Sequence, residues 1–208
     1  MFQREDLEFD NVQIHLMYYH HEFDIQTCFD DLTPEEIAFV QTYKSEKRRQ
    51  EFVATRKLRT QLFGKKTIQY SEIGAPSILN EKYISISHST DIIGIAVCED
   101  FSIGFDLEPI STKVLRVKNK FLHKDEWHWH DCNNPVEVTK IWSAKEALYK
   151  LVQQQGILFS QDLKLEPTKD KTIYLGRIQR NSQWKTVALK SIEYKGSIIC
   201  STIAPLDI

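Results

Sequence analysis

Residues 103–108 (IGFDLE) carry the first side chains whose types and spacing could do chemistry. The apolar/polar alternation predicts a strand, in which neighbouring side chains point to opposite faces. Asp106 and Glu108 then share one face with Gly104. Two carboxylates this close repel each other unless a cation lies between them. Oxygen ligands of this kind suit Mg²⁺, which binds one or two carboxylates together with substrate phosphates. An ordinary solvated strand face is the alternative for this motif alone.

A second group of charged side chains lies in residues 138–152, whose apolar residues cover one arc of a predicted helix. Lys145 falls inside this arc, at ~40° from Ile141. A buried ammonium without a partner is costly, so Lys145 either extends its charge to solvent or meets an anion. Glu146 and Lys150 lie near the edge of the arc and form an i,i+4 pair. Taken alone, that pair is an ordinary surface ion pair.

The third motif is residues 85–89 (SISHS), which ends a predicted strand. His88 and the nearby backbone N–H groups could donate hydrogen bonds to a phosphate. A hydrolase with Ser87 or Ser89 as nucleophile is an alternative, but adjacent strand residues point to opposite faces and no G-x-S-x-G motif is present. A structural histidine without a ligand is also open. The histidines at 123, 128 and 130 fit no standard zinc spacing, and we interpret their segment as a tryptophan-anchored helix.

Basic residues are concentrated between Lys44 and Lys66. This segment contains nine Lys or Arg residues and two acidic residues, so its net charge is +7. The remainder of the chain therefore carries −9, for a total of −2. A local cationic patch on a mildly acidic protein indicates a small polyanion or phosphate site. A nucleic-acid-binding protein is more often basic overall, so we predict no nucleic-acid partner. A solvated helix face is the simpler alternative.

The composition is that of a globular protein, with 41% hydrophobic and 27% charged residues over 208 positions. The longest apolar run, Ile92–Cys98, is far shorter than the ~18 residues that a membrane span needs. No secretory signal is visible, and the four scattered cysteines contain no C-x-x-C pair. We therefore expect a cytoplasmic protein without disulfides or membrane contact.

Helix-then-strand segments occur twice along the chain. The predicted helices cover residues 44–63, 121–130 and 136–155, and a Thr33-Pro34-Glu35-Glu36 capping box begins another. The predicted strands cover residues 12–18, 82–89, 92–98, 103–108, 163–165, 172–179, 184–194 and 197–203. We predict an α+β fold with antiparallel sheets, built as two similar halves, 1–103 and 104–208, in a pseudo-two-fold duplication. A cleft between the halves would hold a ligand, and one chain would suffice to build it, so we expect a monomer.

These motifs, in this order, resemble the 4′-phosphopantetheinyl transferase superfamily, specifically its Sfp-like branch with two halves. The matching segments are SISHS at 85–89, IGFDLE at 103–108 and WSAKEALYK at 142–150. The arginine-rich segment that begins at Arg48 also looks like the N-terminal half of the family, so the resemblance covers roughly residues 45–160. One departure is Ala75, which stands where many members have the lysine of Gly-Lys-Pro and which supplies no cation.

The resemblance implies transfer of the phosphopantetheine arm of coenzyme A to a serine hydroxyl of an apo acyl or peptidyl carrier protein, with release of adenosine 3′,5′-bisphosphate. It also implies a role for each candidate residue. Asp106, Glu108 and Glu146 would hold Mg²⁺, and Glu146 would also be the general base. Lys150 and Lys145 would contact the pyrophosphate or support the site. The phosphates of the nucleotide would be held by Ser87, His88, Arg49 and Arg56, and Lys47 or Arg48 could fill the role of either named arginine.

Carrier proteins are usually acidic helical bundles, which favour apolar anchors with a basic rim. We predict such a surface at Leu115, Val117, Phe121 and Leu122, among Lys113, Arg116, Lys118 and Lys120; the alternative is that this stretch packs against the helix of the second half. A non-catalytic coenzyme A or nucleotide-binding module on the same fold is the second interpretation of the whole chain. A nucleic-acid-binding protein that uses residues 44–66 is the third.

Overall fold

The computed structural model describes residues 2–20, 22–79 and 82–206. The first half of this part contains β1 (Gln3–Phe9), β2 (Val12–Tyr18), η1 (Ile25–Asp31), α1 (Pro34–Val40), α2 (Glu46–Phe63), β3 (Ile68–Tyr70), β4 (Pro76–Ile78), β5 (Tyr83–His88) and β6 (Ile92–Cys98). The second half contains β7 (Phe105–Pro109), the 3₁₀ helices η2 (Thr112–Arg116), η3 (Lys118–Lys120) and η4 (Lys124–His128), α3 (Pro135–Val152), α4 (Phe159–Asp162), β8 (Leu163–Pro167), β9 (Ile173–Arg180), β10 (Gln183–Tyr194) and β11 (Ser197–Thr202).

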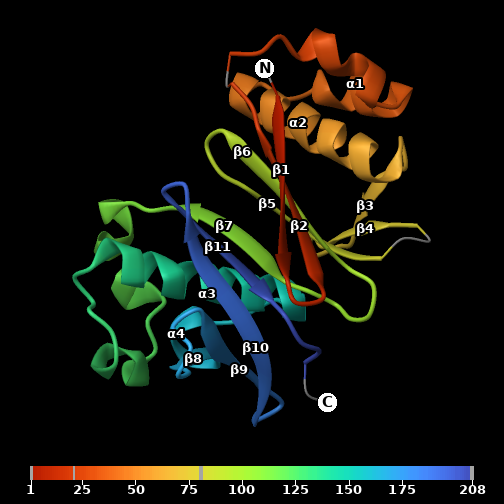
Figure 1. The fold of residues 1–208 in the computed structure, drawn as a ribbon. Coiled ribbons are helices and arrows are strands. Elements are labelled where there is room, and N and C mark those ends of the chain that lie inside the picture. Colours follow the sequence, from red (N-terminus) through yellow and green to blue (C-terminus); the bar gives the residue numbers. More distant parts are fainter. Residues whose placement is uncertain (1, 21, 80–81, 207–208) are drawn as a thin grey trace.

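The described strands form two main antiparallel sheets and one small one (Figure 1). The first sheet has the order β1-β2-β6-β5, and the second has the order β7-β11-β10-β9-β8. Strands β3 and β4 pair separately. The prediction of an α+β fold with antiparallel sheets is therefore confirmed.

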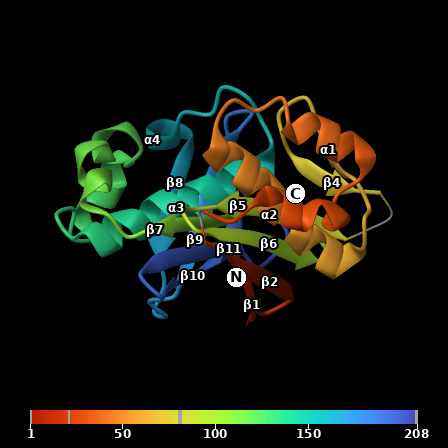
Figure 2. The ribbon, with the colours of Figure 1, turned by 90° about the horizontal axis from the view of Figure 1, so that it is seen from above.

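Each main sheet carries one long helix. Helix α2 contacts β2 and β6, and α3 packs against β7 and β11 (Figure 2). Strand β7 in turn contacts β5 and β6, so the two sheets meet there. A shared apolar core fills this junction; its buried members are Phe9, Val12, Ile14, Leu16, Ala96, Cys98, Ile103, Phe105, Leu107 and Ile199. Strand β7 is thus covered on one side by the first sheet and on the other by α3.

Gly104, directly before β7, lies very close to the backbone of α3. A Cβ atom added at this residue would lie 1.8 Å from the backbone oxygen of Ala147 and 2.8 Å from the backbone nitrogen of Leu151. Both atoms belong to α3, and a helix backbone cannot rotate away as a side chain does. The absence of a side chain at Gly104 therefore sets how close α3 lies to the start of β7.

A polar contact also joins β1 to the turn between β10 and β11. The Tyr194 hydroxyl donates to a carboxylate oxygen of Glu5 at 2.9 Å, and the Lys195 ammonium pairs with the same carboxylate. Glu5 and Tyr194 are 189 positions apart in the sequence. This contact fastens the edge of the first sheet to the second half of the chain.

Several elements agree closely with the sequence predictions. Strands β2 and β6 have the predicted bounds, and Thr33 and Glu36 form the predicted capping box. The helix predicted at residues 121–130 is wrong, because this segment contains only the short η4 and its flanking turns. Strand β1 was not predicted, since its sequence is mostly charged. No helix in the described residues is long and apolar enough for a membrane span, and all four cysteines are free thiols.

Candidate active site

Strand β7 presents its two carboxylates to helix α3, as the alternation of its side chains predicted. Phe105 faces the first sheet, because its ring would meet a Cβ at Gly94, whereas Gly104 faces α3. Asp106 and Glu108 share the Gly104 face. Asp106 is buried at 3% exposure, and Glu108 is partly buried. The close packing at Gly104 therefore brings β7 carboxylates beside the α3 side chains.

Lys150 and Ser87 hold Asp106 in place. The Lys150 ammonium lies 2.8 Å from Asp106 Oδ1 and also donates to the Phe105 carbonyl and the Ser87 hydroxyl, each at 3.0 Å. Ser87 donates to Asp106 Oδ1 at 2.9 Å and accepts from the Leu107 backbone N–H at 3.2 Å. Asp106 Oδ2 is buried without a hydrogen-bond partner in the structure. One Asp106 oxygen is thus fixed, and the other is free to accept.

Two glutamates lie in the electrostatic field of Asp106. Trp142 donates its indole N–H to Glu108 Oε1 at 3.1 Å. Burial, followed by the Asp106 charge, raises the pKa of Glu108. Burial and the charges of Asp106 and Glu108 raise the pKa of Glu146 to about 7, and only Lys150 opposes this shift. The three carboxylates are therefore close enough to hinder one another's ionisation.

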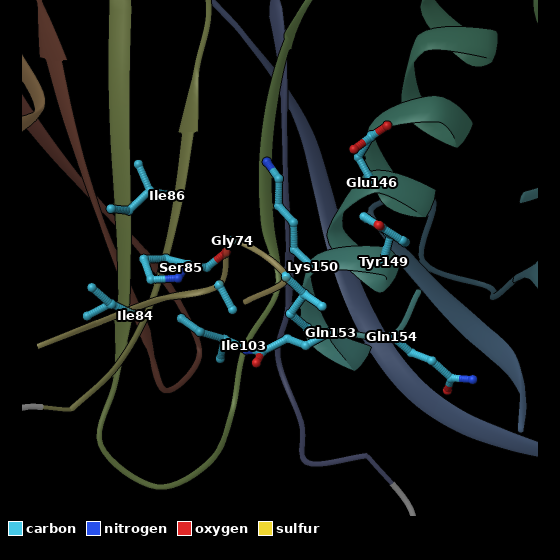
Figure 3. Close-up of a pocket in the computed structure, with 13 residues that line it drawn as sticks. Gly74, Ile84, Ser85, Ile86, Ile103, Glu146, Tyr149, Lys150, Gln153 and Gln154 are labelled. Carbon is cyan, nitrogen blue, oxygen red and sulfur yellow. The ribbon is translucent and has the colours of Figure 1, made fainter. Parts of the chain in front are cut away.

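A pocket of about 200 Å³ opens between α3 and β5 beside this group. Figure 3 shows Glu146, Tyr149 and Lys150 on its α3 side and Ser85 and Ile86 on its β5 side. Gly74 and Ala75 from the loop before β4, and Pro76 at the start of β4, close it. Ala75 thus lines the pocket and supplies no ammonium there.

A second pocket, of about 350 Å³, adjoins the first and is lined by basic and aromatic side chains. The two pockets share Gly74, Pro76 and Ile86. The second pocket is lined by Tyr43, Arg48, Glu51, Phe52, Thr55, Arg56, Tyr70 and His88 besides the shared residues. Three basic side chains around one opening favour an anionic ligand such as a phosphate.

A third opening, an apolar groove of about 590 Å³, lies on the other side of Glu146. Its walls are Val117, Lys120, Phe121, Trp142, Glu146, Tyr149, Ile157, Leu158, Phe159, Ser160 and Gln161. Leu158 and Val117 are exposed at 54% and 39%. Phe121 and Leu122 were predicted as part of an exposed docking surface, but they are only 1% and 4% exposed and pack in the core against α3.

The side chains that could hold the expected Mg²⁺ are the carboxylates of Asp106, Glu108 and Glu146. Among the described residues, no three His, Cys, Asp or Glu side chains are gathered as a ready metal site. The donor chemistry nevertheless fits a hard cation, because Asp106 Oδ2 is buried without a partner and Glu146 is kept from ionising by burial and two neighbouring carboxylates. A cation would neutralise this cluster, and the carboxylates would have to draw closer around it.

A family model described as the 4′-phosphopantetheinyl transferase superfamily matches residues 102–202. This segment of the chain is therefore similar to the 4′-phosphopantetheinyl transferase superfamily. A search of curated proteins found no match to the chain. The segment matched to the superfamily contains Asp106, Glu108, Glu146 and Lys150, whereas the basic pocket is built by residues that precede it.

Lys145, which the superfamily motif led us to expect either at the pyrophosphate or in support of the site, does not line the pocket beside Asp106. It is fully buried, and its ammonium forms an ion pair with Glu126 at 2.7 Å. It also donates to the carbonyls of Phe121, Phe159 and Leu163 at 2.6–3.0 Å. With four partners inside the protein, Lys145 has no donor left for a ligand. The position of Lys145 in the apolar arc required an anionic partner, and that partner is Glu126 of the same protein.

Two further candidates also need correction. The Ser87 hydroxyl has its donor and both acceptor sites engaged by protein groups, so it supports Asp106 rather than a phosphate. Arg49 donates to the Tyr43 carbonyl at 2.8 Å and does not line the basic pocket, whereas Arg48 does. Arg56 and His88 line this pocket.

Sequence reasoning gave no role to Glu126 or Trp142. Glu126 accepts from Lys145 and from the backbone N–H groups of His123 and Leu165. The sequence does contain a capping box, with His123 as the cap and Glu126 three residues later. The prediction of one helix over residues 121–130 hid it, because both residues then fell inside that helix. Trp142 lies four residues before Glu146, on the same face of α3, which is a spacing that could have suggested its contact with the β7 carboxylates.

Proposed function

We propose that this protein transfers the 4′-phosphopantetheine arm of coenzyme A to a serine hydroxyl of an apo acyl or peptidyl carrier protein and uses Mg²⁺. The observation that carries the proposal is the meeting of Asp106 and Glu108 on β7 with Glu146 and Lys150 on α3, at a pocket that continues into a basic one. The match of residues 102–202 to the superfamily supports the reaction class. The carrier, the metal and the Sfp-like branch are parts of the proposal.

In the proposed reaction, the serine oxygen attacks the phosphorus that bears the pantetheine arm. The bond from this phosphorus to the bridging oxygen breaks, and adenosine 3′,5′-bisphosphate leaves with the electron pair. The serine proton passes to Glu146, directly or through one water. Without a cation, burial and the neighbouring carboxylates raise the pKa of Glu146 to about 7. Mg²⁺ bound beside it would lower this pKa, so Glu146 would be ionised and able to accept the proton.

The other residues of the site position the reacting groups and neutralise their negative charge. Asp106, Glu108 and Glu146 would hold Mg²⁺, which when bound neutralises charge on the diphosphate. Lys150 lines the pocket, and its three donors are engaged by Asp106, Ser87 and the Phe105 carbonyl, so it supports the site by holding Asp106 in place. Ser87 and Trp142 orient Asp106 and Glu108 by hydrogen bonds. Phosphoryl transfer needs mainly such positioning and charge neutralisation from a protein.

The apolar groove beside Glu146 is the proposed entry of the carrier protein. It lies next to the proposed base, and its lining includes exposed Leu158 and Val117 together with basic Lys120. An acidic helical carrier would meet apolar anchors and a basic rim there. The proposal also includes the predicted division into halves 1–103 and 104–208, with the coenzyme A pocket as the cleft between duplicated halves and one chain sufficient for activity.

The assay that tests the function is mass spectrometry of the carrier. The protein is incubated with coenzyme A, Mg²⁺ and a panel of apo carrier proteins, and each carrier is examined for a gain of one phosphopantetheine. Glu146→Gln serves as the control for catalysis. A gain in at least one carrier, lost in the variant, supports the proposal; no gain in any carrier, with coenzyme A still bound, would favour the non-catalytic binding module.

A further inference from the structure

Glu36 on helix α1 is joined to two arginines of α2 in a buried cluster. Its Oε1 accepts from Arg56 Nε at 3.2 Å and from Arg59 Nη1 at 3.3 Å, and its Oε2 accepts from Arg59 Nη2 at 2.9 Å. The side chains of Glu36, Arg56 and Arg59 are 8%, 7% and 0% exposed. Glu36 also accepts from the Thr33 backbone N–H as part of the capping box, which fixes its position at the start of α1.

The two arginines have different surroundings. Arg59 also donates to the backbone carbonyls of Asp31, Arg56 and Lys66, so its guanidinium is engaged within the protein. Among the described residues, Glu36 is the one hydrogen-bond acceptor of the Arg56 side chain. Arg56 instead lines the basic pocket with Arg48 and His88. It is therefore the member of the cluster that can bind a ligand.

The charges of the cluster do not cancel. One carboxylate faces two guanidinium groups, which leaves one positive charge in a buried setting. Such a charge is costly unless an anion meets it. The Arg56 guanidinium also lies 3.7 Å over the ring of Phe52, so its plane is held by stacking on one side and by Glu36 at Nε. Glu51 lines the same pocket, but its carboxylate lies 3.7 Å from the Lys47 ammonium and 3.8 Å from the His88 ring. Arg56 is thus a pre-oriented cation at the pocket wall whose own cluster does not neutralise it.

We propose that Glu36 is a positioning residue for coenzyme A: it fixes Arg56 against Phe52 so that Arg56 meets the 3′-phosphate of the nucleotide. This inference rests on the proposed function. The diphosphate of coenzyme A belongs beside Lys150 and the β7 carboxylates in the first pocket, and the ligand has only one other phosphate. The adjoining basic pocket is where that remaining phosphate would lie.

The test compares the dissociation constants of coenzyme A and 3′-dephospho-coenzyme A, measured by calorimetry on the full chain. In Glu36→Gln, we expect coenzyme A to bind about tenfold more weakly and the dephospho form to bind as before. The matched control is Glu35→Gln, which removes the same charge from the exposed neighbouring position and should change neither constant. In an Arg56→Ala background, Glu36→Gln should not lower the preference for the 3′-phosphate further.

Glutamine also completes a capping box, so Glu36→Gln retains that contact of α1. If it does not fold, Glu36→Asp keeps the charge beside Arg59 and withdraws the carboxylate by one methylene, with the same pattern expected. Equal weakening of both ligands, an unchanged preference, or an equal effect of Glu35→Gln would overturn the inference while carrier modification by the wild type could still occur. Failure of carrier modification, with the ligand preference as expected, would reject the proposed function and leave the Glu36 role intact.

Discussion

Replacement of Gly104 by alanine should separate the two halves of the candidate active site. The added Cβ would lie 1.8 Å from the Ala147 oxygen, whereas ordinary contact begins at 3.4 Å, so α3 and β7 must part by about 1.6 Å. A misplacement of about 1 Å can lower the rate of a positioned reaction ~100-fold. We therefore expect the rate of phosphopantetheine transfer to fall by about two orders of magnitude, and unfolding to become easier by about 3 kcal/mol, the upper end for an overpacked core.

The matched control for this variant is Gly176→Ala in β9. Its Cβ would meet the side-chain ends of Leu189 and Leu148 at 2.5–2.6 Å, and Leu148 also belongs to α3. These side-chain ends can rotate, so the control should lose some stability and keep most of its transfer rate. Rates come from the mass-spectrometric assay at saturating substrates, and stabilities from urea denaturation. Wild-type activity in Gly104→Ala, or equal losses in both variants, would refute the reasoning that the close contact at Gly104 aligns the site.

Other predictions concern charge and access. In Mg²⁺-free buffer, the stability of the wild type should fall as pH rises from about 4.5 to about 7, because native Glu146 keeps a proton that the unfolded chain has lost. Urea denaturation at several pH values should show a smaller fall in Glu146→Gln, or in the wild type with Mg²⁺ added. Identical pH profiles would contradict this prediction. Arg48→Ala should weaken coenzyme A binding about tenfold in calorimetry, more than Arg49→Ala, and the reverse order would mean that the basic pocket is wrongly assigned. Leu158→Asp should raise the KM for the carrier several-fold and leave coenzyme A affinity unchanged, whereas Leu79→Asp, at a leucine that does not line the groove, should change neither.

The strands that carry chemistry could be predicted because each shows a clear pattern. Residues 103–108 alternate apolar and polar side chains, and the structure places Gly104 toward α3 and Phe105 toward the first sheet as this alternation requires. Strand β1 shows no such pattern, because most of its charged side chains are exposed and it lies at the edge of the sheet, where it pairs only with β2. An edge strand of this kind lacks the apolar alternation by which a half-buried strand is predicted.

The candidate site shows the same division between local and long-range information. The approach of Glu146 and Lys150 to Asp106 agrees with the motifs, because the helix and strand periodicities fix which faces can meet. The partner of Lys145 could not be predicted, since Glu126 lies 19 positions earlier in an irregular segment. Likewise, the choice between Arg48 and Arg49 depends on which face of α2 the pocket adjoins, and that follows from the packing of α1 and η1.

The contact of Glu5 with Tyr194 bears on how the molecule assembles. The hydrogen bond from Ser87 to Asp106 spans 19 positions and the one from Lys150 to Asp106 spans 44, whereas Glu5 and Tyr194 are 189 apart. Loops of such unequal length differ in the chain entropy lost when they close, so the short-range pairs can form first on the folding pathway. The reactive groups can thus find one another early, and β1 can pair early with its neighbour β2. The contact of β1 with Tyr194 instead depends on bringing together residues from nearly opposite ends of the chain.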